Sequence, residues 1–68
     1  MTDDWVKVYS SNQLYETELV KAILDDNEIG SIIMNKQDSA YLFGEIEVYV
    51  SAENAFNARQ LIIQLKGE

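Results

Sequence analysis

The hydrophobic and polar positions of this chain follow an order of periods that predicts five elements of secondary structure. Residues 5–9 alternate with period two, and residues 14–24 repeat with the helical period. Residues 29–34 and 45–50 again have the character of strands, and residues 52–65 repeat like a second helix. The order β-α-β-β-α is the split β-α-β arrangement without its last strand.

This order also predicts how the elements assemble. The third strand should lie between the first two, which gives a mixed sheet of order 1-3-2 with the first strand on an edge and both helices on one face. Alternation in the first strand turns Val6 and Val8 toward the helices. The same alternation places Trp5 and Tyr9 with Tyr49 on the uncovered face. An edge without the usual fourth strand is open to a partner chain.

The first helix has predicted ends and a predicted buried stripe. Ser10 and Gln13 have the spacing of a capping box, so the helix should begin near Ser11. It should end near Asn27, because asparagine tolerates the left-handed conformation of a C-cap. The helical spacing predicts burial of Tyr15, Leu19, Ala22 and Ile23, with Leu14, Val20 and Leu24 beside them.

The later elements differ in how clearly they are patterned. The segment 29–34 alternates only in part, so its register stays open. The strand 45–50 alternates cleanly and predicts two faces: Ile46, Val48 and Val50 inward, Glu45, Glu47 and Tyr49 outward. Ser51 should cap the second helix, and Lys66 in its last turn suits the helix dipole. The inner stripe of that helix is predicted to be Ala55, Ala58, Ile62 and Leu65, with Leu61 beside it.

Length and composition limit the protein to few classes. Sixty-eight residues form one small α+β domain, residues 1–68. A domain of this size commonly needs a disulfide, a structural metal or a partner chain for stability. Cysteine and histidine are absent, and the net charge is −7. Such an acidic chain disfavours nucleic acid and anionic membranes as partners. With an acidic start at residues 1–4 and no long apolar run, we expect a cytoplasmic protein.

The chemistry available to the chain argues against catalysis. Its serines have no histidine to activate them, and there is no glycine loop of the kind that holds phosphates. The acidic run 25–28 is more consistent with a solvated helix end than with a calcium loop, since Ile29 and Lys36 occupy positions where that loop needs oxygen ligands. We therefore expect no enzymatic activity, no metal and no cofactor.

Aromatic side chains are the candidate functional residues. On an open sheet face Trp5, Tyr9 and Tyr49 could stack nucleic-acid bases, but Glu45 and Glu47 lie where that function needs basic residues. They could also cover a small core, or form a protein contact, since tyrosine and tryptophan are enriched at interfaces.

The connection 36–44 carries a second aromatic group. Its apolar triplet, Tyr41, Leu42 and Phe43, could contact a partner or fold back over the core, and the sequence leaves both open. Its polar tip, residues 37–40, should exchange amide hydrogens quickly.

The order of motifs resembles a known family. Trp5 to Tyr9, the helix 18–24, the turn 28–30, the strand 47–50 and an alanine-bearing helix follow one another from Trp5 to Ile62. Together they resemble a small bacterial family of unknown function labelled as a prokaryotic signal-transducing protein. The resemblance implies a ferredoxin-like fold with likeness to PII signalling proteins, and it implies no catalytic residues. Members of the small bacterial family typically carry Gly-Ile after the first helix, where this chain has Glu28-Ile29.

Two functions therefore remain. The first is a non-enzymatic protein-interaction or self-association module, for which the resemblance implies a role in signalling, with a homodimer or partner contact along the edge 5–9. Because the charge of −7 opposes association, such a contact should tighten as salt rises. The second is a PII-like sensor that binds a small molecule in a groove between subunits beside residues 36–44.

Overall fold

The chain forms three strands and two helices in the predicted order. The computed structural model describes residues 4–36 and 44–66. Its elements are β1 (Trp5–Ser11), α1 (Leu14–Asp26), β2 (Ser31–Asn35), β3 (Ile46–Ser51), the short 3-10 turn η1 (Ala52–Asn54) and α2 (Ala55–Lys66). The sheet order is β1-β3-β2, so the predicted split arrangement with β1 on an edge is confirmed.

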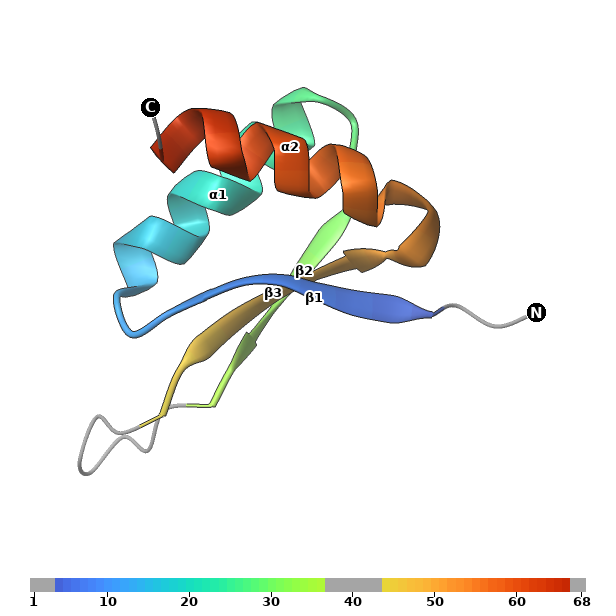
Figure 1. The fold of residues 1–68 in the computed structure, drawn as a ribbon. Helices are drawn as coiled ribbons and strands as arrows, with labels where there is room; N and C mark the ends of the chain where they lie inside the picture. The colour runs from blue at the N-terminus through green and yellow to red at the C-terminus, as the bar shows by residue number, and fades with distance from the viewer. Residues whose placement is uncertain (1–3, 37–43, 67–68) are drawn as a thin grey trace.

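Both helices lie on one side of the sheet, as predicted (Figure 1). Helix α1 contacts all three strands, α2 contacts β1 and β3, and the two helices contact each other. No element within residues 4–36 and 44–66 covers the opposite side of the sheet.

The sheet is antiparallel throughout, so the expected mixed sheet is wrong. Strand β3 pairs antiparallel with β1 on one side and with β2 on the other. The two strands that run parallel, β1 and β2, are the ones that β3 separates. Insertion of β3 therefore removes the parallel pairing that a mixed sheet would contain.

A β-bulge in β1 changes which face its residues occupy. Lys7 pairs with Tyr49, but the next paired residue is Tyr9, which lies opposite Val48. Val8 is thus the extra residue, and after a bulge the alternation of side chains shifts by one position. Tyr9 consequently lies on the helix side of the sheet with Val48, and its predicted place beside Trp5 on the uncovered face is wrong.

The core lies between the sheet and the two helices. Its fully buried strand residues are the predicted inner positions of β3, Ile46, Val48 and Val50. Helix α2 presents Ala55, Ala58 and Ile62 to them, which confirms most of its predicted stripe, whereas Leu65 is exposed. Leu61 is partly buried against the same cluster.

The buried stripe predicted for α1 is wrong at its centre, although burial of the flanking Val20 and Leu24 is confirmed. Its buried residues are Thr17, Val20 and Leu24, while Tyr15 is 67% exposed and Leu19 49% exposed. Apolar residues extend around much of this helix, so their pattern does not specify which of them is central. Thr17 is fully buried, and its hydroxyl donates to the Leu14 carbonyl oxygen at 2.7 Å, so this buried polar group is paired.

The start of α1 also differs from the prediction. Ser10 and Ser11 remain paired with β3, and the helix begins at Leu14 after the N-cap residue Gln13, whose side chain makes no capping bond. The capping box is therefore not formed. The Ser11 hydroxyl instead accepts a bond from the Gln13 backbone N–H at 3.0 Å and orders the turn from strand to helix.

The end of α1 is a Schellman motif. The Glu28 N–H donates to the Asp25 carbonyl at 3.0 Å, and the Ile29 N–H donates to the Leu24 carbonyl at 2.9 Å. The C-cap Asn27 has φ −101°, so the predicted left-handed residue is not Asn27 but Glu28, with φ 63°. Ile29 is buried against Leu24, which supplies the apolar contact of the motif.

Replacing Glu28 with glycine is expected to raise the free energy of unfolding by about 1 kcal/mol. A residue with a Cβ is strained in the left-handed conformation by roughly that amount, whereas glycine is not. Urea unfolding followed by circular dichroism measures the change. Gly30→Ala is the matched control, because a Cβ built at Gly30 meets no atom within 4 Å. A destabilised Glu28→Gly variant would contradict the role given to this turn.

The remaining boundaries shift by one to three residues, the largest shift being at α2, which begins at Ala55 after η1 rather than at residue 52. Strand β2 begins at Ser31, because Ile29 belongs to the turn after α1. Ser51 is the N-cap of η1 but makes no side-chain capping bond. Lys66 lies in the last turn of α2, as predicted. In the part of the chain that the structure describes, neither helix has the length and apolar character needed to cross a membrane.

Candidate functional site

The uncovered face of the sheet is the first candidate surface. Strand pairing places these side chains on it: Trp5, Lys7 and Ser10 from β1, Glu47, Tyr49 and Ser51 from β3, and Ile32 and Met34 from β2. Trp5 at one edge and Ile32 and Met34 at the other are all exposed. We call this set, with Lys36 beside it, the open face.

Glu47 occupies the centre of the open face and is held by three groups. The Tyr49 hydroxyl donates to its Oε1 at 2.8 Å, the Lys36 Nζ lies 3.2 Å from Oε1, and the Lys7 Nζ lies 3.5 Å from Oε2. These neighbours cover Glu47 almost completely, although it lies on the side of the sheet away from the helices. The open face therefore has an ionic centre with apolar side chains at both edges.

The titration behaviour of this cluster follows from its hydrogen bonds. The Tyr49 hydroxyl, and after it Lys36, lowers the pKa of Glu47. The bond to Glu47 raises the pKa of Lys36 and, in Tyr49, raises the pKa of the phenol. Each of these shifts moves the pKa of the group further from pH 7. Glu47 and Lys36 therefore stay charged at pH 7, and neither they nor Tyr49 is poised to exchange protons there.

Tyr9 belongs to a different cluster, on the helix side. Its hydroxyl donates to the Glu16 Oε1 at 3.1 Å and accepts from the Lys66 Nζ, also at 3.1 Å. The Lys66 ammonium lies 5.2 Å from the centre of the Tyr9 ring, and the Ser11 hydroxyl donates to Glu16 at 2.7 Å. These bonds from Ser11 and Tyr9 lower the pKa of Glu16, and the Tyr9 hydroxyl raises the pKa of Lys66. Tyr9 therefore ties β1 to both helices.

A small apolar pocket adjoins the Tyr9 cluster. It has a volume of about 180 Å³ and is lined by Tyr9, Tyr15, Glu16, Leu19, Val20, Leu65 and Lys66. The exposed side chains that the sequence predicted to be buried, Tyr15 and Leu19, form part of its wall.

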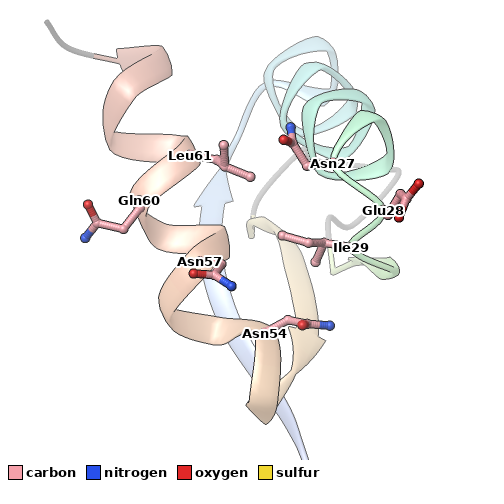
Figure 2. Close-up of a pocket in the computed structure, with 7 residues that line it drawn as sticks. All are labelled: Asn27, Glu28, Ile29, Asn54, Asn57, Gln60 and Leu61. Carbon is pink, nitrogen blue, oxygen red and sulfur yellow. The ribbon is translucent and has the colours of Figure 1, made fainter.

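A larger groove separates the end of α1 from α2. Its volume is about 420 Å³, and it is lined by Asn27, Glu28, Ile29, Asn54, Asn57, Gln60 and Leu61. Figure 2 shows Ile29 and Leu61 extending into the gap from opposite sides. Asn27 lies on the α1 side of the groove, which we call one bank, and Asn54 and Asn57 lie on the α2 side, the other bank. The groove lies where β2 begins and β3 ends, at the opposite end of these strands from residues 36–44.

The predicted contact residues are thus divided among different places. Trp5 and Tyr49 lie on the open face, and Tyr9 lies on the opposite side of the sheet. Tyr41, Leu42 and Phe43 and the predicted fast-exchanging tip 37–40 lie outside the described residues.

Sequence reasoning missed the contribution of β2 to the open face. Ile32 and Met34 alternate with Ile33, which points toward the helices opposite Val48. Residues 32, 33 and 34 are all apolar, so the sequence did not indicate which of them faces outward. The grouping of Lys7 and Lys36 around Glu47 depends on pairing across three strands and has no local signal. Among the residues described, no group of three or more acidic side chains is arranged to hold a metal ion.

Comparison with known proteins identifies a family. No curated protein and no solved structure matches the chain. A family model described as "Putative prokaryotic signal transducing protein" matches residues 5–66, which include every strand and helix of the structure. The chain therefore belongs to this family of prokaryotic proteins, as its resemblance in sequence predicted.

Proposed function

We propose that the chain is a non-enzymatic protein-interaction module in signalling that pairs with a second copy through its open face and the adjoining β1 edge. The observation that carries this proposal is the open face itself. It bears exposed Trp5, Ile32 and Met34 around a fixed ionic centre, and no described element covers it. Tryptophan, tyrosine and methionine are the side chains that interfaces enrich. The proposal places the module in the cytoplasm.

The charge distribution favours a second copy as the occupant. The chain carries −7, but the ionic cluster on the open face contains two lysines and one glutamate. Two copies that meet there do not bring the acidic residues of α1 into direct contact, because Glu16, Glu18, Asp25 and Asp26 lie on the other side of the sheet. The remaining repulsion acts over longer distances, where salt screens it.

The edge of β1 favours a closed pair over an open stack. The bulge at Val8 interrupts the regular ladder, and Lys7 places a charge in the middle of the strand. Bulges and lysines on edge strands discourage indiscriminate strand addition. Contact through the face, with a two-fold axis relating the copies, uses the same residues on both and ends at a dimer.

The absence of a catalytic role rests on the chemistry of the titratable groups. The resolved pKa shifts lower those of Glu16 and Glu47 and raise those of Lys36, Lys66 and Tyr49. General acid–base catalysis needs shifts in the opposite sense, toward the working pH. The groove between the described residues of α1 and α2 does not support the sensor alternative beside residues 36–44, because it lies at the other end of the strands.

Sedimentation equilibrium over a range of protein concentrations and salt tests the proposal. We expect a monomer–dimer equilibrium that tightens as salt rises, because screening weakens the repulsion between two acidic chains. Trp5→Glu and Met34→Glu each introduce a charge at one edge of the open face, and each should weaken the dimer at least tenfold, which is about the effect of a hot-spot residue.

The control for these variants is Ile63→Glu, because Ile63 is exposed on α2, away from the open face. This variant should dimerise like the wild type. A wild-type chain that stays monomeric at high concentration and high salt would overturn self-association. If Trp5→Glu weakened the dimer and Met34→Glu did not, the contact would be confined to the edge and the role of the face would be wrong.

A further inference from the structure

The groove between α1 and α2 has the size of a binding site and lies on the side of the molecule away from the open face. Its volume of about 420 Å³ falls within the usual range of ligand sites. Buried Ile29 and partly buried Leu61 form an apolar floor, and carboxamide side chains stand on both banks. Its lining is mostly polar, with Ile29 and Leu61 as its two apolar residues, so hydrogen bonds rather than apolar burial would hold a ligand there.

The carboxamides are available to a ligand. The side chains of Asn54 and Asn57 make no hydrogen bond to another described residue, which leaves their donors and acceptors open to solvent. Asn27 uses its Nδ2 to donate to the Ile23 carbonyl at 2.9 Å, so its Oδ1 remains as an acceptor facing solvent. Asparagine is also a poor helix former, so helix formation does not explain Asn57 within α2.

The electrostatic surroundings of the groove select against anions. Glu28 lines it, Asp25 and Asp26 precede it in the last turn of α1, and no lysine or arginine lines it. The negative dipole end of α1 and the positive dipole end of α2 both lie at the groove and largely offset each other, so the carboxylates determine the sign of its charge. Lys21 is the nearest basic residue in sequence on α1, and it is paired with Asp25 at 3.1 Å. A ligand in this groove is therefore neutral or basic.

We propose that this groove binds an extended polypeptide segment of a partner protein, neutral or basic in character. An extended chain presents N–H and C=O groups on both of its sides, and the carboxamides on the two banks match this arrangement, because each amide both donates and accepts. One apolar side chain of the segment rests on Ile29 and Leu61. The site is separate from the open face, so one chain binds its second copy and this segment at the same time.

Nuclear magnetic resonance of the full, nitrogen-15-labelled chain tests the proposal, because each carboxamide NH₂ group gives its own signals. The probes are three capped tripeptides with a central leucine, flanked by two lysines, two alanines or two glutamates. We expect saturable shifts of the Asn54 and Asn57 side-chain signals with the lysine and alanine peptides. At low salt the lysine peptide should bind roughly fivefold more tightly than the glutamate peptide, as expected for one charge pair near a surface.

A pair of variants on α2 supplies the control. Asn57→Leu keeps the size of the side chain and removes its amide, and it should weaken binding at least about fivefold, the order of one lost hydrogen bond. Gln64→Leu makes the same kind of change at an exposed position of α2 outside the groove and should bind like the wild type. The backbone spectrum reports whether each variant is folded.

Three results would each overturn the proposal: no shift with any peptide up to its solubility limit, equal binding of the glutamate and lysine peptides, or equal loss in both variants. Shifts centred on Trp5 and Met34 would place the peptide on the open face and would also refute the groove.

Discussion

Leu24→Ala is expected to lower the free energy of unfolding by about 2 to 5 kcal/mol, the range for a fully buried leucine. Leu24 has no exposed surface, packs in the central cluster and supports the turn at the end of α1 through its carbonyl and its contact with Ile29. A domain of this size has a total stability of roughly 3 to 10 kcal/mol, so the variant should be largely or wholly unfolded at elevated temperature.

The matched control for this prediction is Leu19→Ala, on the same helix. Leu19 is 49% exposed, so the same truncation there should cost less than about 1 kcal/mol. Urea unfolding of both variants, followed by circular dichroism, measures the difference. Equal losses, or a larger loss for Leu19, would mean that α1 is rotated toward the stripe that its sequence pattern predicted.

Ala58→Leu is expected to cost about 1 to 3 kcal/mol, because a larger side chain must enter a filled space. Ala58 lies fully buried on α2, within the cluster that includes Val48 and Val50 of β3. The helix contacts β1 and β3 directly, and a small side chain at this position allows that approach. Leucine and alanine have similar helix propensities, so the loss reports on packing.

Ala22→Leu is the control for Ala58→Leu, since the sequence pattern predicted that both alanines are buried. Ala22 is exposed on α1, and the larger side chain should change the free energy of unfolding by less than about 0.5 kcal/mol. Thermal and urea unfolding of the two variants give the comparison. A strongly destabilised Ala22→Leu variant would mean that Ala22 is buried, which would contradict the orientation of α1 in the structure.

The burial of residues in the structure shows where sequence patterns were sufficient. In β3 the aliphatic residues occupy alternate positions, and Ile46, Val48 and Val50 are buried as predicted. In α2 the alanines at 55 and 58 and Ile62 lie on one narrow stripe, and it faces the core. In α1 the apolar residues are spread over more than one face, so packing against the sheet decided which of them became buried.

The candidate sites were less accessible to prediction than the fold. Trp5 and Tyr49 were correctly placed on the uncovered side of the sheet, because each follows from simple alternation within its strand. Tyr9 was placed on the wrong side, because one extra residue in β1 shifts the alternation of side chains. The sequence of the strand does not indicate this bulge. The groove of Figure 2 joins the end of α1 to the start of α2, nearly thirty residues apart in sequence, and appears only when the two helices pack side by side.

By itself, the sequence determined the order of the elements, the strand order that follows from it, the placement of both helices on one face and membership of the family. These properties depend on periodicity within short segments and on general rules of chain connection, which a single chain displays directly. The tertiary structure alone decided the rotation of α1, the face that Tyr9 occupies, the three partners of Glu47 and the groove. Each of these results from contacts between segments far apart in the chain, where packing and hydrogen bonding choose among local patterns of nearly equal energy.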